Sequence, residues 1–161
     1  MLEIATTEDE IRKCVLRAIA SWSVSDFEGL YAISFLIEPP PDDTSRLALY
    51  LSYNTISQWR SRVGGTAAED EVKWNFAFWL QNISLIVTYP DSGGAINDDR
   101  QFVHACVAVA KSIQEYRLLV TIIGKMIPII IHTLEYSLED LEHTKRANPP
   151  DLIAEFVAYE P

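Results

Sequence analysis

Two neighbouring stretches of alternating residues decide the fold class of this chain: GLYAISFLIE at residues 29–38 and RLALYLSY at residues 46–53. In the first stretch both sets of alternating positions are largely apolar, which is typical of a central strand covered on both sides. The second stretch places leucines at every other position, on one face. A proline-rich segment, Pro39–Asp43, separates them and cannot continue a strand. The two stretches are therefore predicted to pair as a hairpin with a wide loop.

Helices are predicted on either side of this hairpin along the chain. Thr7-Glu8-Asp9-Glu10 is a capping box, so a helix should follow it and end near Ser23–Ser25. From Asp98 or Asp99 to Ile123, apolar residues recur at spacings of four and three, which predicts about seven helical turns ended by Gly124. Shorter helices are expected in three places: from Asn54 or Thr55 to Gly64-Gly65, after the capping-box variant Ser137–Asp140, and after Asn148-Pro149.

Two further apolar stretches are predicted to be strands. Ile83–Tyr89 is one, and Lys125–His132 is the other, with Pro128 favouring either a place at the sheet edge or a position among the first residues of the strand. Thr66–Glu71 is a polar connection, and Lys73–Trp79 fits either a strand or a short helix. This order of elements predicts a single α+β domain over residues 1–161. The expected architecture is a small, mostly antiparallel sheet, with a mixed sheet as the alternative, and helices packed on it.

Charge and hydropathy exclude two kinds of partner. The chain has 161 residues and a net charge of −10, which argues against nucleic acid because phosphate binding needs clustered lysine and arginine. Its most apolar stretch, Leu118–Ile131, is shorter than the roughly 20 residues that cross a membrane. Residues 2–10 are acidic where an export signal would be basic, so a cytoplasmic location is expected. Cys14 and Cys106 lie in helical apolar patterns and are predicted to be buried free thiols.

The sequence contains no catalytic, metal-binding or cofactor-binding motif. Its three histidines lack the spacing of metal ligands, and neither Gly64-Gly65 nor Gly93-Gly94 fits a phosphate-binding loop. No metal or cofactor is therefore predicted. One arrangement remains for an enzyme, a small hydrolase with a pocket formed by His132, Glu135 and His143. That hypothesis requires the three side chains to lie close together in the fold.

Acidic and aromatic residues suggest a protein-binding surface instead. Trp59, Trp74 and Trp79 fall within one short segment, where packing in the core is the simplest interpretation. Tryptophan beside acidic residues is also common in protein interfaces. The candidate partner-binding residues lie on two predicted loops next to the strands: Asp42 and Asp43 on one, and Glu69, Asp70 and Glu71 on the other.

Three segments in order resemble a family of small bacterial proteins without an established activity: Leu49–Thr55, Val72–Trp79 and Thr144–Pro149. The shared pattern is an Asn-Thr pair at the end of a strand, a basic residue and Trp opening a segment that ends in a second Trp, and a late Asn-Pro. Ile56 and Ala147 depart from that pattern. Proteins of this family are typical of gene neighbourhoods rich in toxins and immunity proteins. The resemblance implies an immunity or partner-binding role, whereas the motif residues themselves are interpreted as structural.

Three functional hypotheses follow. The first is a non-enzymatic binding protein, specifically an immunity protein whose acidic surface covers a basic toxin domain. The second is a structural domain that forms a homo-oligomer through the apolar face of the long helix or through a sheet edge. The third is the small hydrolase described above.

Overall fold

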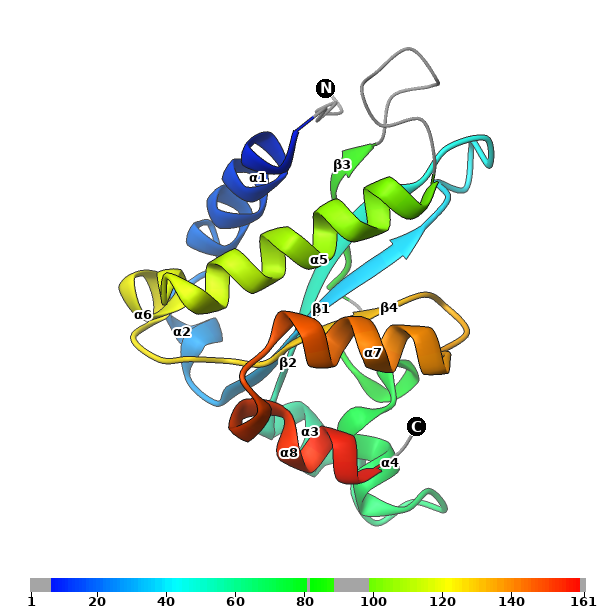
Figure 1. Ribbon diagram of the computed structural model, residues 1–161. Helices are drawn as coiled ribbons and strands as arrows, with labels where there is room; N and C mark the ends of the chain where they lie inside the picture. Colours follow the sequence, from blue (N-terminus) through cyan, green and yellow to red (C-terminus); the bar gives the residue numbers. More distant parts are fainter. Residues whose placement is uncertain (1–6, 81, 89–98, 160–161) are drawn as a thin grey trace.

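The computed structural model describes residues 7–80, 82–88 and 99–159, and four strands of this part of the chain form one sheet in the order β3-β2-β1-β4 (Figure 1). β1 (Leu30–Glu38) pairs antiparallel with β2 (Ala48–Thr55), which pairs antiparallel with β3 (Ser84–Thr88). β4 (Ile129–His132) lies parallel to β1 on its other side. The predicted α+β class and the hairpin are confirmed, and the sheet is the mixed variant.

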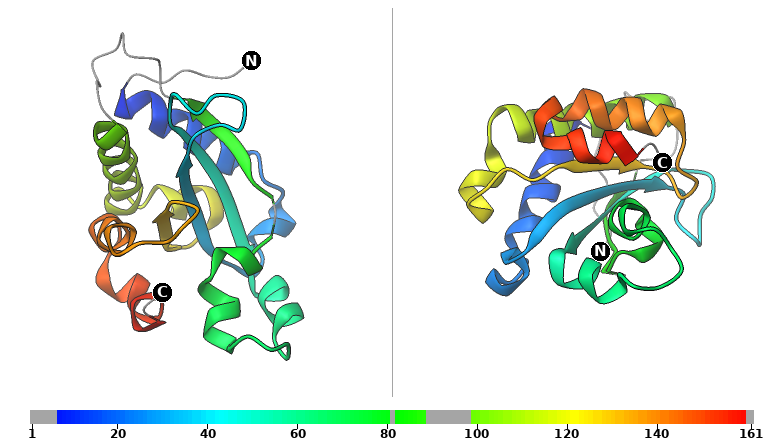
Figure 2. Two further views of the ribbon diagram at one scale, coloured as in Figure 1. Left: turned by 90° about the vertical axis from the view of Figure 1, so that its right-hand side faces the viewer. Right: turned by 90° about the horizontal axis from the view of Figure 1, so that it is seen from below.

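The two faces of β1 are buried under different layers, as its doubly apolar pattern predicts. Ile33, Phe35 and Ile37 point into the larger core, which α1 (Glu8–Ala20) and α5 (Asp99–Glu115) cover. Ala32 belongs to a second cluster on the opposite face, with aromatic residues from later in the chain. Figure 2 shows the sheet between these two layers.

Capping side chains start the helices where the sequence predicts. The Thr7 hydroxyl accepts from the Glu10 backbone N–H, and Ser137 and Asp140 repeat the capping box for α7 (Leu138–Ala147). Thr55 caps α3 (Ile56–Arg62). α8 (Pro150–Tyr159) follows the Asn-Pro motif. The first predicted helix is shorter than expected: α1 ends at Ala20, and a separate short helix, α2 (Val24–Phe27), precedes β1.

Residues 69–79 contain two short helices and no strand. α4 (Glu69–Trp74) begins inside the segment expected to be a polar connection, and a 3₁₀ turn, η1 (Phe76–Phe78), follows it. The strand alternative for Lys73–Trp79 is therefore wrong. The Asn75 side chain accepts from the Ala77 backbone N–H and bends the chain, so that Trp74 and Trp79 are both buried. An alternating aromatic pattern does not distinguish this turn from a strand.

The long predicted helix is interrupted. α5 ends at Glu115, Arg117 adopts a left-handed conformation with φ of 52°, and α6 (Leu118–Ile123) continues in a new direction. Tyr116, expected on the apolar stripe, is 72% exposed, whereas Leu119 is fully buried. Residue spacing cannot reveal a change in direction when apolar residues continue beyond it. Gly124 ends α6 with a positive φ, as predicted, and the alternative helix start at Asp98 lies outside the described residues.

Side chains of α7 and its C-cap close the outer edge of β4. The Thr144 hydroxyl accepts from the Ile131 N–H at 2.9 Å and donates to the Ile131 carbonyl at 3.1 Å. The Asn148 amide binds both backbone groups of Ile129, at 2.9 and 2.7 Å. β4 is an edge strand of the described sheet and begins directly after Pro128, so the predicted strand is shorter at its start than Lys125–His132. Its outer edge is occupied by side chains instead of another strand.

Cys106 is a free and fully buried thiol, as predicted, whereas Cys14 is only partly buried. Within the described residues, helices long and apolar enough to cross a bilayer are absent.

Candidate functional site

The residues of the Asn-Thr and Lys-Trp…Trp motifs meet in one hydrogen-bonded network under the sheet. The Lys73 carbonyl accepts from the Tyr31 hydroxyl at 2.6 Å and from the Trp79 indole N–H at 2.9 Å. Asn54, fully buried at the end of β2, donates to the Tyr31 hydroxyl at 2.8 Å. With Trp74 and Trp79 only 6% and 2% exposed, these motif residues support the fold.

The charged end of Lys73 lies among aromatic rings. Its ammonium is 4.8 Å from the ring centroid of Trp59 and 5.1 Å from that of Trp74, and it pairs with Glu155 of α8. Such cation–π contacts are favourable because the ring faces carry negative potential. Trp59 is half-buried and donates its indole N–H to the Glu69 carbonyl at 3.3 Å. α3, α4 and α8 are thus joined through one lysine.

The helices α4 and α8 pack together and carry several carboxylates, and we call the surface of these two helices the α4–α8 face (Figure 1). The neighbouring helix α3 carries the exposed Arg60 and Arg62. Glu69 and Asp70 are exposed, whereas Glu71 is half-buried. Lys73, the one basic residue on these two helices, is already paired with Glu155. The face comprises the carboxylates of these helices: Glu69, Asp70, Glu71, Asp151 and Glu155.

The structure does not bring the two predicted acidic segments together. Asp42 and Asp43 lie in the loop between β1 and β2, at the far end of the sheet from α4 (Figures 1 and 2). The eight residues of β2 separate the two ends by about 25 Å. Asp43 also binds within its own loop, to Ser45 and Arg46, which lowers its pKa to about 2. Asp42 is exposed.

Beside the α4–α8 face, the protein has a hollow of about 280 Å³, which we call the aromatic pocket. Trp74 and Tyr159 come from the ends of α4 and α8, and His132 comes from the end of β4. Leu134 also lines the pocket and is 73% exposed. The complete lining is Trp74, Asn75, Phe76, Ala77, Trp79, Ile130, His132, Thr133, Leu134, Tyr136 and Tyr159.

His132 at the base of this pocket is a neutral, buried histidine. Its Nδ1 lies 2.9 Å from the Thr133 carbonyl, which can only accept, so Nδ1 carries the hydrogen and Nε2 accepts from the Ser34 hydroxyl at 2.7 Å. Burial lowers the pKa of His132 and outweighs the opposite effect of Asp140. The side chain therefore carries no positive charge at neutral pH.

Two other wall residues of the aromatic pocket have unsatisfied polar atoms. The indole nitrogen of Trp74 is buried without a hydrogen-bond partner in the described part of the chain. The Tyr136 hydroxyl lies near Thr144 but makes no hydrogen bond of ordinary length and angle. Burial raises the pKa of Tyr136, so this hydroxyl stays protonated. Both atoms are buried, so neither is exposed to the pocket in this structure.

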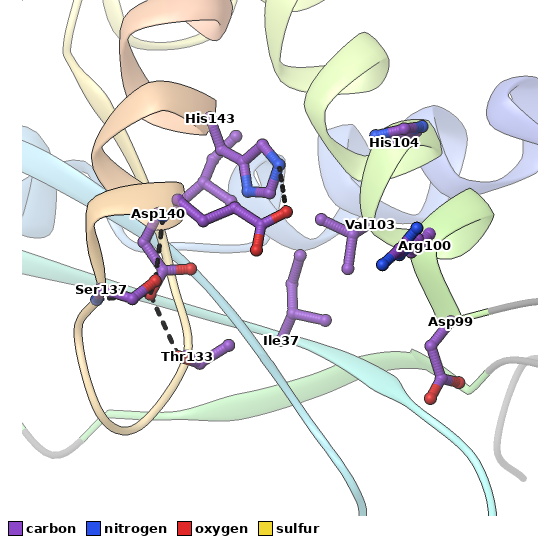
Figure 3. A pocket seen from close by; sticks show the side chains of 11 residues that line it. Ile37, Asp99, Arg100, Val103, His104, Thr133, Ser137, Asp140 and His143 are labelled. Atoms are coloured by element: carbon purple, nitrogen blue, oxygen red, sulfur yellow. Dashed lines mark hydrogen bonds and ion pairs between the residues drawn. The ribbon is translucent and has the colours of Figure 1, made fainter.

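A smaller hollow of about 190 Å³, the histidine pocket, lies between α5 and α7 (Figure 3). Its lining includes His104 and His143, whose ring centroids are 6.4 Å apart. His143 Nε2 is 4.0 Å from Glu139, and burial lowers the pKa of His143. Asp140 is committed to the turn before α7, where it accepts from Ser137 and Thr133. The Asp140 carboxylate, which could otherwise orient His143 as a catalytic base, is therefore engaged in capping α7.

The three residues of the hydrolase hypothesis do not share a pocket. His132 lines the aromatic pocket, His143 lines the histidine pocket, and the exposed Glu135 lines neither. Since alternate residues of a strand face opposite sides, Ile131 and His132 at the end of β4 border different hollows. Within residues 7–80, 82–88 and 99–159, no three His, Cys, Asp or Glu side chains are grouped to hold a metal ion.

The surfaces suggested for self-association are largely used inside the fold. Phe102, Cys106 and Ile113 of α5 are fully buried. The outer edge of β4 is bonded to Thr144 and Asn148. β3 is the other edge strand of the described sheet.

Sequence reasoning identified the tryptophans but missed the aromatic pocket. Tyr136 and Tyr159 belong to no aromatic pattern in the sequence. His132 is grouped in the hydrolase hypothesis with Glu135 and His143, which do not line this pocket. The alternation along β4 could have placed His132 on the same face as Ile130. No local pattern could show that the ends of α4 and α8 meet there.

Comparisons with protein-family models, curated proteins and solved structures find no match to this chain.

Proposed function

We propose that this protein is a non-catalytic binding domain that holds a basic protein partner on its α4–α8 face. The observation that supports this function most directly is the charge of the face, whose lysine is neutralised by Glu155. The net charge of −10 adds a long-range attraction for a basic partner. An immunity protein that covers a basic toxin domain is the specific form that we favour.

The first test is capture of the partner from the organism that encodes the chain. Tagged protein is incubated with lysate, eluted in a salt gradient, and the eluate is identified by mass spectrometry. A stoichiometric basic protein released by moderate salt is the expected result, because salt screens charge attraction. Recovery of the chain by itself, or with acidic proteins that resist salt, would contradict the proposal.

Charge reversal then locates the surface. Asp70→Lys should slow association with the purified partner about 3- to 10-fold at low salt, with a smaller effect at high salt. Asp42→Lys is the matched control, because it makes the same change in net charge at the opposite end of the sheet. Equal effects of both variants on the association rate would assign the attraction to net charge and remove the α4–α8 face from the proposal.

The immunity form makes a stricter demand on the captured partner. Expression of the partner alone should stop growth of a bacterial host, and co-expression with this chain should restore it. The Asp70→Lys variant should restore growth less well than Asp42→Lys at equal protein levels. A partner that is harmless when expressed alone would exclude the immunity role while leaving the binding function intact.

A further inference from the structure

The aromatic pocket and the α4–α8 face share two helices. Trp74 is the last residue of α4 and Tyr159 is the last residue of α8, and both line the pocket. A protein seated on the acidic face would therefore lie next to this hollow. The exposed side chain of Leu134 gives the pocket an apolar rim of the kind found around anchor residues in interfaces.

The electrostatics of the pocket favour a cation. Aromatic faces attract positive charge, and lysine and arginine are absent from the described residues that line the hollow. Asp140 lies close enough to act on His132 and Tyr136, and Asp70 and Glu71 on Tyr159. The cation near the wall is Lys73, whose ammonium is 5.1 Å from the Trp74 ring centroid and is paired with Glu155. His132, the remaining titratable base at the wall, is held neutral by burial.

We propose that the aromatic pocket receives the guanidinium of an arginine side chain from the basic partner. This inference rests on the proposed binding function and deepens it, because it names the group that the partner inserts. Guanidinium is planar, stacks on aromatic rings and is less strongly hydrated than ammonium, so a pocket of rings suits arginine better than lysine.

The chain itself provides a precedent for this recognition. Lys73 places its own ammonium against the rings of Trp59 and Trp74 and close to Tyr31, at 4.8, 5.1 and 5.8 Å from the ring centroids. A carboxylate, Glu155, completes that arrangement. The aromatic pocket offers similar rings, and none of the described residues that line it is a lysine or arginine.

Two capped peptides that differ in one atom group test the proposal. Acetyl-Gly-Arg-Gly-amide is titrated into the full chain and compared with the citrulline peptide, which has nearly the same shape but no charge. Binding is followed through the indole N–H resonances of Trp74 and Trp79, with Trp22 as the internal reference. Trp22 packs on Tyr53, in the larger core, and is not a wall residue of the pocket.

The arginine peptide should shift the two pocket indoles and bind about 5- to 30-fold more tightly than the citrulline peptide. Tyr159→Ala removes one wall at the end of the last helix and should weaken arginine binding by a similar factor. Tyr116→Ala, which removes an exposed tyrosine that does not line the pocket, should leave binding unchanged. Equal binding of both peptides, absence of shifts, or unchanged binding to Tyr159→Ala would overturn the inference.

The peptide test and the partner test can fail separately. If the partner binds and Asp70→Lys weakens it while the arginine peptide causes no shift, the binding function stands and the pocket assignment is wrong. If the peptide binds as expected but no basic partner is captured, the pocket recognises guanidinium and the proposed function is wrong.

Discussion

At the scale of single residues, Asn148 joins three parts of the chain. Its amide accepts from the Gln114 side chain at 2.8 Å and from the Ile129 N–H at 2.9 Å. It donates to the carbonyls of Ile129 and Thr144, at 2.7 and 2.8 Å. The third motif of the family resemblance, Asn-Pro, is therefore explained by the fold: the Asn148 side chain links the end of α7 to β4.

Replacing Asn148 by alanine should lower the free energy of unfolding by about 2–4 kcal/mol, because buried backbone groups of Ile129 lose their partners. Urea unfolding measures the change. Ser57→Ala, at an exposed position on α3, serves as the control and should stay within about 0.5 kcal/mol of the parent. A loss below about 1 kcal/mol for Asn148→Ala would show that water replaces the amide.

At the scale of elements, α7 takes the place of a fifth strand at the β4 edge. Thr144→Val keeps the shape of the side chain but removes the hydroxyl that binds both backbone groups of Ile131. Amide hydrogen exchange at Ile131 should become faster, while Ile130 stays protected because its backbone faces β1. Uniform acceleration across β4 would instead indicate global destabilisation, and an unchanged rate at Ile131 would contradict the edge-closing role.

The break between α5 and α6 is a second feature of this scale. Arg117 has φ of 52° and ψ of 36°, a conformation that disfavours residues with a Cβ atom. Arg117→Gly should therefore raise the free energy of unfolding by about 0.5–1 kcal/mol, measured by urea unfolding. Arg62→Gly, near the end of α3 and without a positive φ, should lower it instead. Destabilisation by Arg117→Gly would mean that the arginine side chain contributes more than the backbone strain removes.

At the scale of the whole molecule, the stability should depend on pH through buried histidine. The folded-state pKa of His132 lies below the usual 6.5, so the unfolded chain binds the proton more readily. The stabilisation that neutral His132 contributes is therefore complete above pH 6.5, and it is lost as the pH falls from 6.5 towards the lower folded-state pKa. Between about pH 7 and 5.5, the free energy of unfolding should fall less steeply with pH in His132→Gln than in the parent. The difference in slope should be at most about 1.4 kcal/mol per pH unit.

His104→Gln is the control for this pH series, because His104 is exposed on α5. The parent and the control should lose stability in parallel as the pH falls, as measured by urea unfolding at each pH. An unchanged slope in His132→Gln would show that other groups, of which His143 has the same direction of shift, account for the dependence.

The charge distribution also belongs to the whole molecule. Five candidate binding residues were inferred from composition, yet the fold divides them between opposite ends of the sheet. Glu69, Asp70 and Glu71 lie on α4, which packs against α8. Asp43 instead forms an ion pair with Arg46 in its own loop. Separation along the sequence does not reveal this division, because β2 runs from one end of the sheet to the other between the two acidic segments.

The sequence by itself determined the elements whose signals are local. The hairpin followed from two alternating stretches, and α1 and α7 followed from their capping boxes. These features depend on sterics and hydrogen bonds between residues close along the chain, which composition and spacing record directly.

Only the tertiary structure decided the break between α5 and α6 and the assembly of the aromatic pocket. The chain turns at Arg117 so that Ile113 of α5 and Leu119 of α6 are both buried. Trp74, His132 and Tyr159 line one hollow because three separate elements end there, and Tyr136 joins them from the loop after β4. Long-range packing also places His132 and His143 in two different pockets. A site of this kind is made by long-range packing, which no local pattern in the sequence encodes.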